Sequence, residues 1–171
     1  MKKITLAALA FLAGAGAAVA QNAPAPQNPP PPPARGPALE VALEAAQAAL
    51  DAAKTGDQKV AVTIIDSAGI IKLALVSDGT GPRAVQNSNF KAQAALAFKE
   101  PSGQLAEEAK SNKELADKIA ANPNYLARAG AVLLKVNDEV IGAIGVGGAR
   151  GSDKDEAYAK AGVARIEAKL K

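Results

Sequence analysis

The stretch Ile141–Glu156, IGAIGVGGARGSDKDE, decides the fold because it joins an apolar strand pattern to a helix through a glycine-rich turn. A dinucleotide-binding turn would need G-x-G-x-x-G at this place, followed by a second parallel strand. Gly145 and Gly147 fit the first two glycine positions, but Arg150 occupies the third. The G-K-[ST] sequence of a P-loop does not occur in the stretch either. We therefore expect a strand of an antiparallel sheet here, and not a phosphate-binding turn.

The polar end of this stretch fits the start of a helix. Ser152 can cap the helix, and Asp155 follows three residues later, as in a capping box. Carboxylates in a first turn stabilise the helix dipole, but they repel a phosphate at the same place. Glycine inside a strand pattern indicates a bulge or the close approach of another backbone, from a helix or from a second subunit. Gly142, Gly145 and Gly148 are therefore expected to be structural.

Two β-hairpins are predicted, and the second strand of the later one extends into the glycine-rich stretch. The runs VAVTIID, 60–66, and IIKLALVS, 70–77, are separated by the turn residues Asp-Ser-Ala-Gly. The runs AVLLKV, 131–136, and EVIGAIGV, 139–146, flank the short turn Asn137-Asp138. The first hairpin is apolar on both faces, so this part of the sheet should be covered on both sides.

Helical patterns surround the hairpins, over residues 39–56, 84–98, 104–121 and the last part of the chain. The first helix should bury a stripe formed by Leu39, Leu43, Ala46, Leu50 and Ala53. The last helix should bury Ala159, Val163, Ile166 and Leu170. The order helix, hairpin, helices, hairpin, helix predicts an α+β domain, in which helices flank an antiparallel sheet.

The first 20 residues have the pattern of a secretory signal peptide. Lys2 and Lys3 precede an apolar core, and Ala18–Ala20 forms a cleavage motif, so cleavage is expected after Ala20. The apolar run is shorter than the roughly 20 residues that a membrane span needs, although a retained anchor is the alternative. The mature protein is expected to be periplasmic or secreted, without a membrane span.

Residues 21–37, QNAPAPQNPPPPPARGP, are Pro-rich and predict an extended linker, with a PxxP ligand as the alternative. Residues 38–171 are then expected to form one domain. The whole chain has 20 Lys and Arg against 17 Asp and Glu. Removal of Lys2 and Lys3 leaves 18 against 17, so the apparent basicity nearly disappears. This balance excludes nucleic acid as a partner.

The composition also excludes several kinds of chemistry. The chain has no His and no Cys, and Met1 is its only Met. Ser-His-Asp triads, cysteine nucleophiles, thiolate or imidazole zinc sites and the usual axial ligands of haem are therefore ruled out. Carboxylate pairs such as Glu107 and Glu108 remain, but on an exposed helix they are typical of a solvated face. No catalytic or metal-binding residue is predicted, and enzymatic activity is left open.

Three segments share an order of motifs with a known family: VAVTIIDSAGIIKLALVSDGTGP, FKAQAALAF and DEVIGAIGVGGARGSDKDEAYAKAG. Together they resemble the GlcG/HbpS-like family, over residues 39–171. The chain departs from the family pattern at Ala94, where the family has Thr, and at Gly147, where it has Ser. The resemblance implies a profilin-like sheet flanked by helices, and assembly into dimers or larger oligomers. It also implies a role in binding tetrapyrroles such as haem.

The predicted ligand-binding residues follow from this resemblance. They are Asp78, Gly79, Thr80, Arg83, Lys91, Tyr125, Arg128 and Tyr158. If haem iron is ligated directly, one of the two tyrosines or a lysine must hold it, because phenolate is the strongest iron ligand left in this composition. The two arginines are candidates for pairing with the haem propionates.

Three functions therefore compete. The leading hypothesis is an exported small-ligand-binding module for haem or a related tetrapyrrole, with haem as its possible cofactor. The alternative is a non-haem structural or interaction domain that oligomerises, and the third is a haem-degrading protein, by family resemblance alone. A homo-oligomer is expected in each case, through residues 142–148 or the small-residue helix faces. The mature chain has only four aromatic residues, so a second subunit can supply further burial.

Overall fold

The computed structural model describes residues 33–171. The signal peptide predicted for residues 1–20, and residues 21–32 of the predicted linker, lie outside the described residues. The helices are α1 Leu39–Thr55, α2 Ala84–Phe98, α3 Ser102–Glu108, α4 Lys113–Ala120 and α5 Ser152–Ile166, followed by a short 3₁₀ turn, Glu167–Lys169. The strands are β1 Ala61–Asp66, β2 Ile71–Val76, β3 Ala131–Val136 and β4 Glu139–Gly147.

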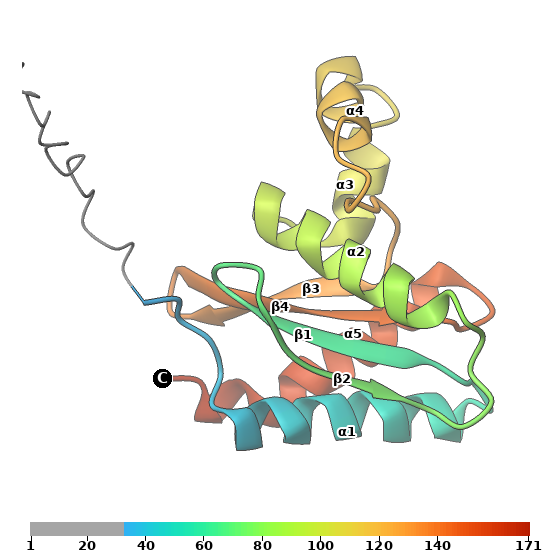
Figure 1. Ribbon diagram of the computed structural model, residues 1–171, viewed down its shortest axis with the longest axis vertical. Coiled ribbons are helices and arrows are strands. Elements are labelled where there is room, and N and C mark those ends of the chain that lie inside the picture. The colour runs from blue at the N-terminus through green and yellow to red at the C-terminus, as the bar shows by residue number, and fades with distance from the viewer. Residues whose placement is uncertain (1–32) are drawn as a thin grey trace, which may run out of the picture. The chain divides into compact units, whose positions relative to one another are not determined.

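The four strands form one antiparallel sheet in the order β2-β1-β4-β3 (Figure 1). Each outer pair is a hairpin, and the two hairpins meet where β1 pairs with β4, with Val62 opposite Val146 and Ile64 opposite Ile144. The prediction of two hairpins in a single sheet is therefore confirmed, and so is the α+β class.

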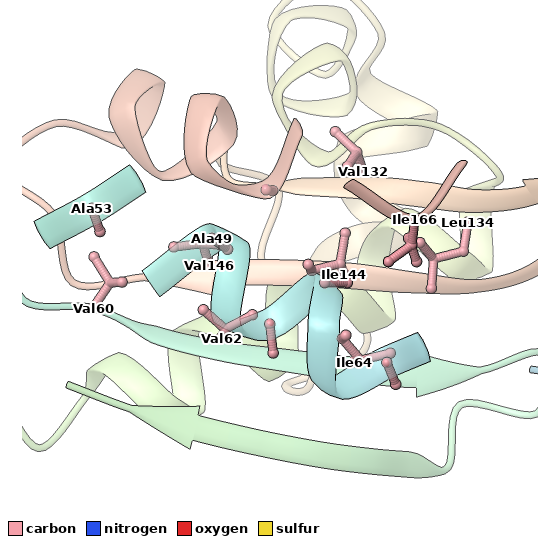
Figure 2. Packing of buried hydrophobic residues seen from close by; sticks show 14 of the residues in the cluster. Ala49, Ala53, Val60, Val62, Ile64, Val132, Leu134, Ile144, Val146 and Ile166 are labelled. Carbon is pink, nitrogen blue, oxygen red and sulfur yellow. The ribbon is translucent and has the colours of Figure 1, made fainter. Parts of the chain in front are cut away.

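Helices cover both faces of this sheet (Figure 1). Helices α1 and α5 pack on one face, while α2 packs on the other, chiefly over β4 and β1. Figure 2 shows the larger core, where Val62, Ile64 and Ile144 of the sheet meet Ala49 of α1 and Ile166 of α5. All six residues of β1 are buried, in agreement with a strand covered on both sides.

The buried stripe of α1 differs from the one that the sequence predicted. Leu39 and Leu43 are 56% and 50% exposed. Ala46 and Ala53 of the predicted stripe are buried, and Leu50 is partly buried against the larger core. The other buried residues of α1 are Ala42, Ala45 and Ala49. The reason is the close approach of α5: a Cβ atom added to Gly162 of α5 would lie 2.7 Å from the Ala45 carbonyl oxygen of α1. Only alanine-sized side chains fit between helices at that separation, so Leu39 and Leu43 point outward.

The turn of the first hairpin is built as predicted. The Asp66 carboxylate oxygen Oδ1 accepts hydrogen bonds from the backbone N–H groups of Ala68 at 2.9 Å and Ile70 at 3.0 Å. Gly69 has a φ of 77°, in the left-handed region that glycine adopts without strain. A side-chain acceptor and one glycine therefore fix this turn locally.

The helix predicted over residues 104–121 is wrong as a single element, because the chain breaks between Glu108 and Lys113 into α3 and α4. Asn112 is the N-cap of α4, and its Oδ1 accepts a hydrogen bond from the Leu115 N–H at 3.1 Å. Asparagine favours such a cap over a helix interior, so it starts a new helix here.

Residues 33–37 contact the first hairpin turn. The Arg35 N–H donates to Ser67 Oγ and the Ser67 N–H donates to the Arg35 carbonyl oxygen, both at 2.8 Å. The Arg35 guanidinium also pairs with Glu139 at the start of β4, and Pro37 is buried. Among the described residues, no helix has the length and apolar character needed to cross a bilayer.

The glycines of β4 pack inside the subunit. A Cβ atom at Gly145 would collide with the Ser88 carbonyl oxygen of α2, and one at Gly147 would lie 2.8 Å from that of Ala84. Of the two expectations for these glycines, close packing against a helix is therefore the one observed. Residues 141–147 are all buried, as is the alanine face of α1, so the structure does not offer these surfaces to a second subunit.

Candidate functional site

The predicted ligand-binding residues separate into groups at the two ends of α2 and on the opposite face of the sheet. Asp78, Gly79, Thr80 and Arg83 lie in the loop that leads from β2 into the N-terminus of α2, whereas Tyr125 lies near its C-terminus. Lys91 and Arg128 lie between these ends, beside a buried carboxylate. Tyr158 is on α5, across the sheet from α2. The structure therefore does not bring the predicted residues into one site.

A groove at the C-terminal end of α2 contains Tyr125. It has a volume of about 470 Å³, within the range of about 300–1,000 Å³ typical of small-molecule sites. Its lining residues are Ser67, Ala68, Gly69, Gln93, Leu96, Ala97, Lys99, Tyr125 and Val140. The groove thus has a mixed lining, in which a few apolar side chains lie beside polar groups, one phenol and one ammonium group. We call it the Tyr125 groove.

The Tyr125 ring is held by its neighbours. It meets the ring of Phe98 edge to face, with centroids 5.7 Å apart and planes at 75°. The Tyr125 N–H donates to the Asn122 carbonyl oxygen at 3.0 Å, and the Leu126 N–H donates to that of Phe90 in α2 at 3.1 Å. These contacts attach the segment after α4 to α2, so the phenol has a fixed place beside the groove.

The opposite wall of the groove is joined to α2 as well. The Gln93 side-chain amide donates from Nε2 to the Gly69 carbonyl oxygen at 2.7 Å, which ties the β1–β2 turn to the helix. Gln93, Leu96 and Lys99 were not among the predicted site residues. Gln93 and Leu96 are three residues apart on the last turns of α2, a spacing that places them on one side of the helix, and Lys99 is the C-cap residue that follows.

Tyr158 has a different environment. Its hydroxyl lies close to Gly56, at the end of α1, because a Cβ atom added to that glycine would be 2.7 Å from the oxygen. The side chain packs against the larger core and lines none of the depressions described for this structure. Tyr158 is therefore a packing residue in this arrangement.

Lys91 is one half of a buried ion pair. Its Nζ donates to Asp155 Oδ2 at 2.7 Å and to the Val146 carbonyl oxygen at 3.1 Å, and the residue is only 2% exposed. Burial lowers the pKa of the Lys91 ammonium, Asp155 opposes this, and the charge of the nearby Arg128 adds to the lowering. Burial likewise raises the pKa of the Asp155 carboxyl, against the effect of Lys91. Because the ammonium already has two acceptors, Lys91 does not face a ligand.

The start of α5 also differs from the predicted capping box. Gly151 is the N-cap residue, with a φ of 120°, and no side chain caps it. Asp155 turns inward instead, where its Oδ1 accepts the Ala149 N–H at 3.0 Å and its Oδ2 binds Lys91. The signal for this pair is a lysine among alanines in FKAQAALAF: a charge on the apolar face of a helix needs a buried partner.

Thr80 has a structural role in its loop. Its hydroxyl donates to the carbonyl oxygens of Ser77 at 2.6 Å and Val60 at 3.3 Å. Gly79 has a φ of 73°, and a Cβ atom added there would lie 2.9 Å from the Lys59 ammonium nitrogen. Within residues 33–171 there is no group of three or more His, Cys, Asp or Glu that would hold a metal ion.

The antiparallel sheet and the helices that flank it define a profilin-like α+β domain. The model of the family described as "Haem degrading protein HbpS-like" matches residues 38–164. The chain therefore belongs to the HbpS-like family, as its motifs predicted.

Solved structures agree with this assignment. The alignment with a crystal structure of HbpS covers 74% of this chain and 87% of HbpS. The two sequences are 34% identical there, and the TM-score is 0.69. The alignment with a double mutant of HbpS from Streptomyces reticuli covers 83% of this chain and 95% of the mutant, at 31% identity and a TM-score of 0.71. The protein in the PduOC:heme complex shares the fold, with a TM-score of 0.69. That alignment covers 75% of this chain and 94% of the other, at 18% identity. No curated protein matches the sequence.

Proposed function

We propose that this chain is an exported protein that binds haem or a related tetrapyrrole in the Tyr125 groove. Membership of a haem-related family supports the ligand class, and a complex of a protein with the same fold and haem agrees with it. Export is supported by the signal-peptide pattern that ends at Ala20. The observation that carries the proposal is the position of Tyr125 in the lining of a groove of suitable volume, in a chain without His or Cys.

The residues of the groove fit a haem group in three respects. Leu96, Ala97 and Val140 offer apolar contacts to a porphyrin face. Lys99 offers a cation to a propionate, and Tyr125 offers a phenolate to the iron. When bound, haem would supply an iron centre whose axial position a tyrosine can occupy, as in catalase. We propose binding because each of these contacts holds or orients the ligand.

Replacement of Tyr125 with Phe is expected to weaken haemin binding about tenfold or more and to change the Soret band, because it removes the axial oxygen. The edge-to-face contact with Phe98 needs only the ring, so the fold should be retained. The measurement is an absorbance titration of the mature protein with haemin.

Tyr158→Phe is the matched control, since it removes the other phenol of the mature chain on the far face of the sheet. It should bind haemin as the unmodified protein does. Absence of a saturable spectral change in the unmodified protein would contradict haem binding. Equal affinity and an unchanged spectrum in Tyr125→Phe would contradict the proposed site.

Self-association is proposed as a second property, through the outer edge of β2. This strand is an edge of the sheet, and Ile71 and Val76 on it are 50% and 48% exposed. An exposed apolar edge strand is a template for pairing with another chain. Sedimentation at micromolar concentration is expected to give a dimer or larger species, which Val76→Lys should dissociate because lysine blocks edge pairing. A strict monomer would contradict the proposal.

A further inference from the structure

The β2–α2 loop and the β4–α5 loop lie at the other end of α2 (Figure 1). A second depression is lined by residues of both loops. One part of it, about 510 Å³, is lined by Asp57, Gln58, Lys59, Gly79, Gly81, Gly148 and Arg150. An adjoining part, about 280 Å³, is lined by Gly81, Pro82, Arg83, Ala84, Asn87 and Gly148. The two parts share Gly81 and Gly148, so they form one depression. Three cations, Lys59, Arg83 and Arg150, line these two parts together with the carboxylate of Asp57. A third part adjoins them through Asp57, Gln58 and Lys59, and it is also lined by Lys54, Asp51 and Asp78.

The walls of this depression are fixed by hydrogen bonds within the protein. On one side, the Thr80 hydroxyl and the Ser77 N–H hold the β2–α2 loop to the Val60 carbonyl oxygen. On the other side, the Arg150 N–H donates to Gln58 Oε1 at 2.8 Å, and the buried Asp155 carboxylate accepts the Ala149 N–H. A cavity with walls held in this way is preorganised for a ligand.

The cationic side chains are not used by the fold. Within residues 33–171, Lys59, Arg83 and Arg150 form neither an ion pair nor a side-chain hydrogen bond. The Lys59 ammonium lies against Gly79, where any side chain would displace it. Around Gly81 the space is open, since a Cβ atom there would meet no atom within 4 Å. Glycine backbone and free cations thus border the same volume.

We propose that this depression is a binding site for a small oxyanion ligand, one that bears carboxylate or phosphate groups. Arg83 and Arg150 supply two guanidinium groups to the depression, and arginine binds carboxylate and phosphate in a bidentate manner. The N-terminus of α2, at Ala84, opens onto the depression and adds a partial positive charge.

This site is separate from the Tyr125 groove. The two lie at opposite ends of α2, whose 15 residues span about 22 Å, and they share no lining residue. An oxyanion bound here would therefore not need a tetrapyrrole, and either ligand could bind without the other.

The test uses ¹⁵N-labelled mature protein, titrated separately with inorganic phosphate and with succinate at low, constant ionic strength. The amide resonances of Gly79, Gly81 and Gly148 are expected to shift in a saturable way with at least one of the two. The ligand that saturates identifies the source, phosphate or dicarboxylate. Arg150→Gln should weaken binding about tenfold or more, because it removes a charged hydrogen-bond donor. Lys72→Gln, which removes an exposed cation from β2, should change the affinity less than twofold.

Two results would overturn the proposal. Non-saturating shifts that sodium chloride reproduces would indicate general screening of surface charge. Equal weakening by Arg150→Gln and Lys72→Gln would indicate dependence on net charge alone. Haemin titration of Arg150→Gln distinguishes this site from the proposed tetrapyrrole site: unchanged haemin affinity is expected, and a loss would make the depression part of the tetrapyrrole site.

Discussion

Replacing Asp155 with Ala is expected to destabilise the protein by about 3–5 kcal/mol, because it leaves the Lys91 ammonium buried without its carboxylate partner. The side chains of Lys91 and Asp155 are 2% and 5% exposed, so bulk water does not solvate either charge in the folded protein. The Ala149 N–H also loses its acceptor, which loosens the loop after β4. The measurement is the free energy of unfolding, from a denaturant titration followed by circular dichroism.

Asp153→Ala is the matched control for this variant. Asp153 is an exposed carboxylate in the same first turn of α5, so its loss should change stability by about 0.5 kcal/mol or less. Equal stabilities of the Asp153→Ala and Asp155→Ala variants would contradict the role given to the buried pair.

A double variant separates the cost of breaking the pair from its net contribution. Burial shifts the pKa of each partner toward its neutral form, which indicates that desolvation opposes the charged pair. Lys91→Met combined with Asp155→Leu removes both charges at once. This variant is expected to be much closer in stability to the unmodified protein than either single change is, because no unpaired charge remains buried. Strict additivity of the single effects would contradict direct coupling.

The sheet could be predicted from the sequence because its signals are local. The turn Asp66–Gly69 carries its own acceptor and its own left-handed residue, and the alternative α/β fold fails at Arg150. The α2 boundaries, Ala84–Phe98, were also predicted, since Pro101 and Gly103 follow shortly after.

The features that the sequence did not predict depend on residues that are distant in the sequence. The hydrophobicity of Leu39 predicted burial, but the approach of Gly162 in α5 decides that α1 turns its alanines inward. Lys91 and Asp155 are 64 positions apart, so the local pattern shows that Lys91 needs a buried partner but does not identify Asp155 as that partner. The Tyr125 groove likewise combines the β1–β2 turn, α2 and the loop after α4, and only the fold brings them together.

Replacing Gly145 with Ala is expected to destabilise the protein by about 3 kcal/mol or more, through overpacking between β4 and α2. The added Cβ atom would collide with the Ser88 carbonyl oxygen and lie 3.1 Å from the Ala92 Cβ atom. Neither obstacle is a flexible side chain. Helix α2 is also held here by a buried hydrogen bond, 2.7 Å long, between the hydroxyls of Ser88 and Thr63. The helix must therefore move as a whole, or the strand must bend.

Gly81→Ala provides the control for this glycine. Gly81 has no positive φ, and a Cβ atom there meets nothing within 4 Å, so the same change should alter stability by about 0.5 kcal/mol or less. Unfolding titrations of the two variants in parallel give the comparison. Because α2 carries one wall of the Tyr125 groove, a shifted helix in Gly145→Ala should also weaken haemin binding. Equal stability of the two variants would mean that α2 does not lie as close to β4 as this packing requires.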